Sequence, residues 1–154
     1  MIRLRPHHLL CLLTYAGKGY SEAFVANFDA IVSRLASGSA WVEIVEGPDE
    51  VCQPLLGSCE HHCEEASVRV RDRLAAEDIT RLLSRIEALA PVLAGSSSLV
   101  MAPGARLALT AERVQQMRAA FALGEIRRAC AGCPWQGLCD EIAAQGFAAT
   151  RLLS

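Results

Sequence analysis

The stretch from Ser21 to Gly38, SEAFVANFDAIVSRLASG, decides the fold class of this chain. Its apolar residues recur at helical spacing, at positions 24, 25, 28, 31, 32 and 35, so the stretch predicts an amphipathic helix with one buried face. Ser21 is a favourable residue for the N-cap of this helix, and Gly38 suits its end. The class that follows is mostly helical.

Further helices are expected on both sides of this one, and Pro6 suits the first position of the earliest. They are predicted over 6–15, over 64–76, over 79–93, from a cap at Thr110 up to Gly124, and over 136–144. Short β-prone runs predict strands at 2–4, 41–45, 99–101 and 106–109. We therefore expect a mostly α (α+β) chain, with residues 1–154 forming a single domain around a small β element.

Composition excludes several classes of protein. With 154 residues, 52% hydrophobic and 21% charged, the chain can bury a proper core. A net charge of −2 and only 5% aromatic residues argue against a nucleic-acid binder. No apolar run approaches the ~20 residues of a membrane span. Arg3 and Arg5 precede an apolar stretch as in a signal peptide, but Gly17-Lys18-Gly19 stands where a cleavage site is expected. The sequence therefore predicts a cytoplasmic, soluble protein.

Seven cysteines suggest metal binding, because they cluster in a chain of ordinary size. The sharpest pattern is Cys130-Ala-Gly-Cys133-Pro-Trp-Gln-Gly-Leu-Cys139, in which three thiolates can wrap one inorganic centre. A [4Fe–4S] cluster needs four thiolates, so the fourth has to come from elsewhere in the chain. Zinc is the main alternative, and buried cysteines that only pack are the other.

Cys52 and Cys63 are the main candidates for the fourth ligand. Cys63 directly precedes Glu64, at the predicted start of a helix, where free N–H groups favour a thiolate. Cys52 lies in an irregular loop after a Gly-Pro-Asp turn. We favour Cys63 narrowly over Cys52, with Cys11 third, and treat Cys59 as incidental.

A second constellation lies near the N-terminus. If residues 6–15 are helical, Cys11 lies one turn from His7 and His8, so a thiol–imidazole pair with a lowered thiol pKa is a candidate nucleophile. Lys18 is the only lysine of the chain and lies in a glycine turn. These four residues form a candidate catalytic pocket. The alternative is a purely structural role, in which Cys11 is a buried cysteine and the two histidines satisfy backbone groups in the first turn of the helix.

Four ordered motifs resemble a known family, the bacterial and archaeal domain of unknown function 1284. They are Arg5-Pro6-His7-His8-Leu9-Leu10-Cys11, Gly17-Lys18-Gly19-Tyr20-Ser21, Gly47-Pro48-Asp49-Glu50-Val51-Cys52 and Cys130-x2-Cys133-Pro-Trp-x3-Cys139. The resemblance implies an iron–sulfur binder to which no reaction is assigned. The family's cysteine positions match this chain at Cys11, Cys52, Cys63, Cys130, Cys133 and Cys139.

Two function classes follow from these observations. In the first, the cluster is structural or transfers electrons, and the chain serves a redox or protein partner that the sequence does not specify. In the second, the chain is a small metal-dependent enzyme whose pocket of His7, His8 and Cys11 lies next to the cluster. Complete ligation by cysteine favours the first class, and an iron left open to substrate favours the second.

Overall fold

The fold is described by a computed structural model that covers residues 1–19, 21–37, 41–52, 66–89, 100–133 and 135–152. The described helices and strands are β1 (Ile2–Leu4), α1 (Pro6–Thr14), α2 (Glu22–Ser37), β2 (Trp41–Ile44), α3 (Ala66–Leu89), β3 (Arg106–Ala108), α4 (Ala111–Ala122), the 3₁₀ turn η2 (Arg128–Cys130) and α5 (Gln136–Ala144). The described part is helical with a small sheet, which confirms the α+β class.

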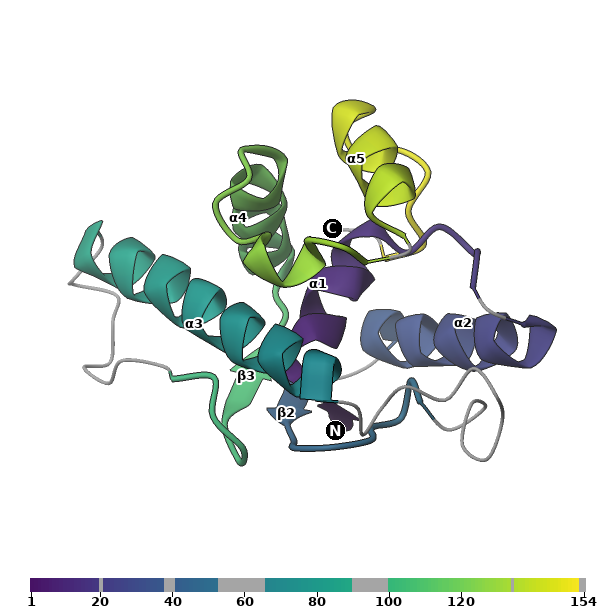
Figure 1. Cartoon of the computed structure of the whole chain (residues 1–154), viewed down its shortest axis with the longest axis horizontal. Coiled ribbons are helices and arrows are strands. Elements are labelled where there is room, and N and C mark those ends of the chain that lie inside the picture. Colours follow the sequence, from purple (N-terminus) through teal and green to yellow (C-terminus); the bar gives the residue numbers. More distant parts are fainter. Residues whose placement is uncertain (20, 38–40, 53–65, 90–99, 134, 153–154) are drawn as a thin grey trace.

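Helix α1 lies in the middle of the molecule, with α2 and α3 on opposite sides and α4 and α5 over one end (Figure 1). Its leucines at positions 9, 10, 12 and 13 are all buried. Because α1 carries buried side chains on most of its faces, it is a core helix and not an amphipathic surface helix. Pro6 occupies its first turn as predicted.

The sheet has the order β1-β2-β3 and covers the N-terminal end of α1. β1 runs parallel to β2 with Arg3 opposite Glu43, and β3 runs antiparallel to β2. The strand predicted at 99–101 is wrong for residues 100 and 101. The Met101 N–H donates to the hydroxyl of Thr80 on α3, so it does not join a strand ladder.

Helix α3 corrects a second prediction, because it runs unbroken over residues that we assigned to two helices. No glycine or proline interrupts positions 76–79, so nothing stops the helix there. Asp78 in this stretch is buried and accepts hydrogen bonds from the backbone N–H and Nε of Arg128. This link anchors η2, and with it the C-terminal cysteines, to α3.

Two predicted caps are present. Ser21 Oγ accepts from the N–H of Phe24 ahead of α2, and Thr110 Oγ1 accepts from the N–H of Arg113 at the start of α4. Within the described residues, no helix has both the length and the apolar character needed to cross a membrane. Cys59, His61, His62 and Cys63 lie outside the described residues, and so does the predicted helix start at Glu64.

Candidate functional site

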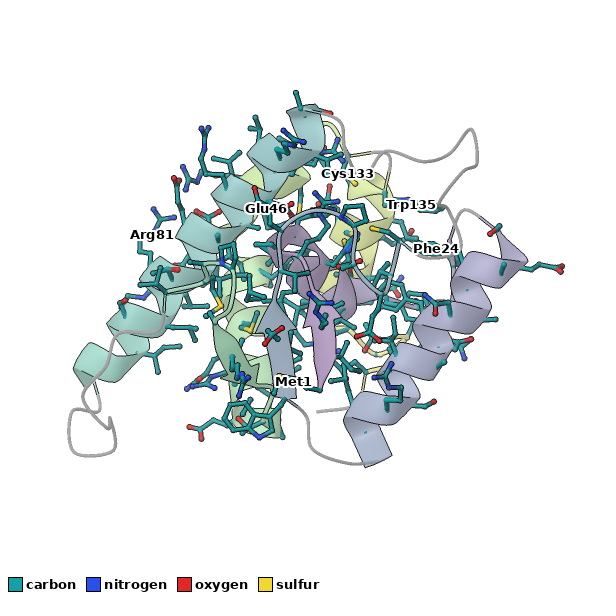
Figure 2. All side chains as sticks on the ribbon, turned by 90° about the horizontal axis from the view of Figure 1, so that it is seen from below. Met1, Phe24, Glu46, Arg81, Cys133 and Trp135 are labelled. Atoms are coloured by element: carbon teal, nitrogen blue, oxygen red, sulfur yellow. The ribbon has the colours of Figure 1, made fainter. Side chains whose placement is uncertain are left out.

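A cavity of about 320 Å³ brings together residues from distant parts of the sequence. Five cysteines contribute to its lining: Cys11, Cys52, Cys130, Cys133 and Cys139. We call it the cysteine cavity. His7, His8 and Lys18 also line it, so the two constellations of the sequence share one site. Figure 2 labels Cys133, Trp135 and Phe24, three lining residues that lie toward one side of the molecule.

The C-terminal cysteine motif (Cys130, Cys133 and Cys139) is presented by a turn and a helix. The N–H of Cys133 donates to the carbonyl of Cys130 over 3.0 Å, and Gly132 between them has a φ of 75°. A positive φ suits glycine, so the short spacing of the first pair depends on this residue. Cys139 follows in the first turn of α5, 3.2 Å from the hydroxyl of Thr14 on α1.

Cys11 on α1 lines the same cavity as the C-terminal cysteine motif. Burial raises the pKa of the Cys11 thiol well above its usual value, and the thiols of Cys130, Cys133 and Cys139 raise it further. Four thiols thus oppose each other's ionisation in one cavity. A metal centre supplies the positive charge that allows such a group to ionise.

The spacing of these four thiols is wider than a single ion requires. Among the described residues, three possible ligand atoms lie within 4.8 Å of one another, and they belong to His8, Asp49 and Cys52. No three of the four thiols lie that close together. In a tetrahedral zinc site the sulfurs lie about 2.3 Å from the metal and hence about 3.8 Å apart. In every set of three of these thiols, at least one pair of sulfurs is therefore farther apart than in a closed zinc site.

Arg127 supplies positive charge beside the motif. Burial raises the pKa of Cys130, and the neighbouring Arg127 guanidinium opposes that rise. Its Nε and Nη2 atoms are buried and have no hydrogen-bond partner within the described ranges. The Cys130 thiol is within reach of this guanidinium, which would stabilise its thiolate form. Arg128, the next residue, pairs with Glu77 and Asp78 on α3.

His7 is held by a carboxylate that sequence analysis did not identify. Its Nδ1 lies 2.6 Å from Oδ1 of Asp72 on α3. The other oxygen of this carboxylate, Oδ2, accepts a hydrogen bond from Nε of Arg5 over 2.8 Å and forms an ion pair with Nη2 of Arg5 over 2.7 Å. Burial raises the pKa of Asp72, but His7 and Arg5 outweigh it and leave that pKa below its usual value. Asp72 therefore orients one imidazole and neutralises one buried cation.

His8 has an equivalent partner in the turn after β2. Its Nδ1 lies 2.7 Å from Oδ2 of Asp49, whose side chain is fully buried. Burial alone would raise the pKa of Asp49, but His8, the backbone N–H of Arg5 and the Cys52 thiol lower it to about 2. The other oxygen, Oδ1, accepts from the backbone N–H groups of Val51 and Cys52. Asp49 thus fixes both the His8 ring and the position of Cys52.

The expectation that His7 or His8 lowers the Cys11 pKa is wrong. Neither imidazole hydrogen-bonds to Cys11 in the described part of the chain, and each directs its Nδ1 at a carboxylate. Burial and the neighbouring thiols raise that pKa instead. Lys18 lines the same cavity from an exposed position after Gly17, whose φ is 82°.

Protonation of His7 is expected to destabilise the metal-free chain. Burial and the charge of His8 lower the pKa of His7 from 6.5 to about 4, although Asp72 opposes the shift. Between these values the unfolded chain binds a proton that the folded chain does not, so stability falls as pH falls through this window. From pH 7 to pH 5 we expect a loss of about 2 kcal/mol in urea unfolding.

The variant His7→Gln isolates this effect, because it removes the titrating group and keeps a polar side chain. The pKa of Asp49 is about 2, so this carboxyl group does not change the free energy of unfolding between pH 7 and pH 5. We expect most of the pH-dependent loss to disappear in the variant. An equal loss in both proteins would assign the effect to other groups.

The structure brings the candidates His7, His8 and Cys11 into one cavity with the C-terminal cysteine motif, but sequence analysis did not identify Asp49 and Asp72. Asp49 belongs to the Gly47-Pro48-Asp49 turn, and Asp72 lies between Arg71 and Arg73 in a predicted helix. A carboxylate within a Gly-Pro-Asp turn is one signal that could have pointed to Asp49. Asp72 has no local signal, because its partners lie 65 and 67 positions away.

The fold and the cavity define a helical α+β chain with a cysteine-lined site, and the comparisons place it in a family. Residues 19–139 match the family described as protein of unknown function, DUF1284. The chain therefore belongs to this family. The matched part contains Cys52 and the C-terminal cysteine motif. No curated protein and no solved structure matches the chain.

Proposed function

We propose that this protein binds a [4Fe–4S] cluster in the cysteine cavity, with the C-terminal cysteine motif as three of the four ligands. The observation that carries the proposal is the placement of four thiols, from α1 and from the η2–α5 segment, around one cavity of about 320 Å³. Four thiolates are the number that a [4Fe–4S] cluster needs, because each of its four irons takes one thiolate ligand.

The surroundings also suit the cluster. Arg127 brings a partly buried guanidinium beside Cys130, although its Nη1 is paired with Asp140. Thr14 places a hydroxyl 3.2 Å from the Cys139 sulfur, and hydrogen bonds to sulfur tune the potential of such centres. Trp135 lines the cavity and reduces the access of water. A cluster bound here supplies electron transfer or structural support.

The fourth ligand is Cys11 or Cys63. Among the described thiols, Cys11 is favoured because it lies with the motif, whereas Cys52 lies with Asp49 and Arg5. Cys63, the first choice from the sequence, stays a prediction because it lies outside the described residues. Both assignments give complete ligation by cysteine and favour a structural or electron-transfer role.

A metal-dependent enzyme is the second candidate. The observation that favours it is the pair of carboxylate-held imidazoles, His7 with Asp72 and His8 with Asp49, on the wall of the same cavity. Imidazoles oriented in this way are suited to proton transfer or metal ligation. This reading requires an iron or another metal that is open to substrate.

Anaerobic purification tests the proposal. The protein is expected to be brown, with a broad sulfur-to-iron absorption band and about four irons and four sulfides per chain. A colourless protein that holds one zinc and takes up no iron with added ferrous salt and sulfide would contradict it. Zinc found after handling in air would not, because it can replace a lost cluster.

A further inference from the structure

We infer that His8, Asp49 and Cys52 form a second metal site, separate from the four thiols, for one divalent transition-metal ion such as zinc or ferrous iron. One nitrogen, one oxygen and one sulfur atom from these residues lie within 4.8 Å of one another. This mixed donor set matches the borderline character of these ions.

The site is rigid before any metal arrives. The Asp49 side chain is completely buried and receives three backbone N–H groups, from Arg5, Val51 and Cys52. These bonds fix the carboxylate relative to β1 and to its own turn. Cys52 lies three residues after Asp49 and is 2% exposed. Metal sites commonly rely on such supporting hydrogen bonds to hold their ligands in place.

Metal binding would exchange protons without any redox step. The ion takes the place of the proton between His8 Nδ1 and Asp49 Oδ2, which lie 2.7 Å apart, and the neutral imidazole then carries its proton on Nε2. The Cys52 thiol releases its proton to solvent when it becomes a thiolate ligand, so one proton leaves the site. The site then carries two negative ligands against two positive charges on the ion.

The fourth coordination position faces the cavity. His8 and Cys52 both line the cysteine cavity, whereas the buried Asp49 lies behind them. Three protein ligands with one open position are typical of zinc sites that bind a water or a substrate group. The two-site arrangement therefore places an exchangeable metal position on the wall of the cavity that holds the cluster ligands.

Cobalt titration of the full-length chain tests this site, because tetrahedral Co²⁺ reports its ligands by its visible bands and by a thiolate-to-cobalt band. The host is Cys133→Ser, stripped of metal under reducing conditions, in which the cluster ligands are incomplete. We expect one Co²⁺ per chain with mixed nitrogen and sulfur ligation. His8→Gln and Cys52→Ser in this host should each weaken the binding of Co²⁺ at least about tenfold.

His7→Gln is the matched control. His7 neighbours His8, with 4.2 Å between the ring centroids, but its Nδ1 is held by Asp72 and it is not part of the three-atom group. It should therefore leave cobalt affinity unchanged. Circular dichroism verifies the fold of each variant, and if Cys52→Ser unfolds, the comparison of the two histidine variants decides.

Equal cobalt affinity in His8→Gln and His7→Gln would overturn the inference, and so would a host that binds no cobalt. Failure of the cluster proposal has a different signature, because it is the absence of iron and sulfide in the wild-type chain. Loss of the wild-type cluster in Cys52→Ser would also contradict the inference, since Cys52 would then be a cluster ligand.

Discussion

Protein carrying Cys133→Ser is expected to emerge from anaerobic purification without brown colour and with nearly all of its iron and sulfide lost. Cys133 lies in the turn between η2 and α5, so its thiol is presented by backbone geometry that serine preserves. The loss would therefore reflect the missing thiolate, which the cluster needs as a ligand. Cys130→Ser and Cys139→Ser should behave in the same way.

Cys52→Ser is the matched control in this series. It changes another cysteine of the same cavity, but one that interacts with Asp49 and Arg5, so the brown colour and the sulfide content of the cluster should be retained. Cys59→Ser should also be neutral. If Cys133→Ser retains the full iron content, the C-terminal motif is not the cluster site.

The same series identifies the fourth ligand. If Cys11 is the fourth ligand, Cys11→Ser should lose the cluster. If the fourth ligand is Cys63, as the sequence predicts, Cys63→Ser should lose the cluster. If both variants retain full iron, the fourth iron has no thiolate from either residue. The enzyme interpretation would then become the stronger one, because that iron would be open to substrate.

The second large effect concerns stability, and it arises from Asp72→Asn. Arg5 is completely buried, and two of its guanidinium nitrogens contact one oxygen of Asp72. Removing the negative charge breaks this buried ion pair, which typically costs ~3–5 kcal/mol. Urea unfolding of metal-free protein at pH 7 should reveal this as a large decrease in the free energy of unfolding.

An exposed ion pair provides the control for that measurement. Glu125 pairs with Arg85 over 2.8 Å, with side chains 41% and 54% exposed. Glu125→Gln removes the same charge but should change the free energy of unfolding by less than ~1 kcal/mol. Similar small losses in both variants would mean that Arg5 does not depend on Asp72.

Local patterns predicted the helices well where one face is apolar. The α2 pattern from Ser21 and the Thr110 cap of α4 both depend on neighbours within four residues, and both are present. The single α3 helix was missed because its sequence carries two apolar patterns in succession. A change of pattern was interpreted as a break, although no residue there stops a helix.

The sequence indicated which cysteines and histidines belong to the candidate site, but it did not indicate which side chains hydrogen-bond to them. Motif spacing identified the cysteines and the two histidines, because ligands close in sequence leave a local signature. The partners Asp49 and Asp72 act across 41 and 65 positions, and only the fold brings them to the histidines. The same holds for Cys11, whose proximity to the motif follows from the packing of α1 against α5.

The most direct test of the cluster proposal is anomalous X-ray scattering at the iron edge from crystals grown without air. We expect a strong iron peak inside the cysteine cavity, bonded to the sulfurs of Cys130, Cys133 and Cys139 and to one further thiolate. A cavity without iron, or a single metal ion bound by fewer than three of these thiols, would contradict the proposal.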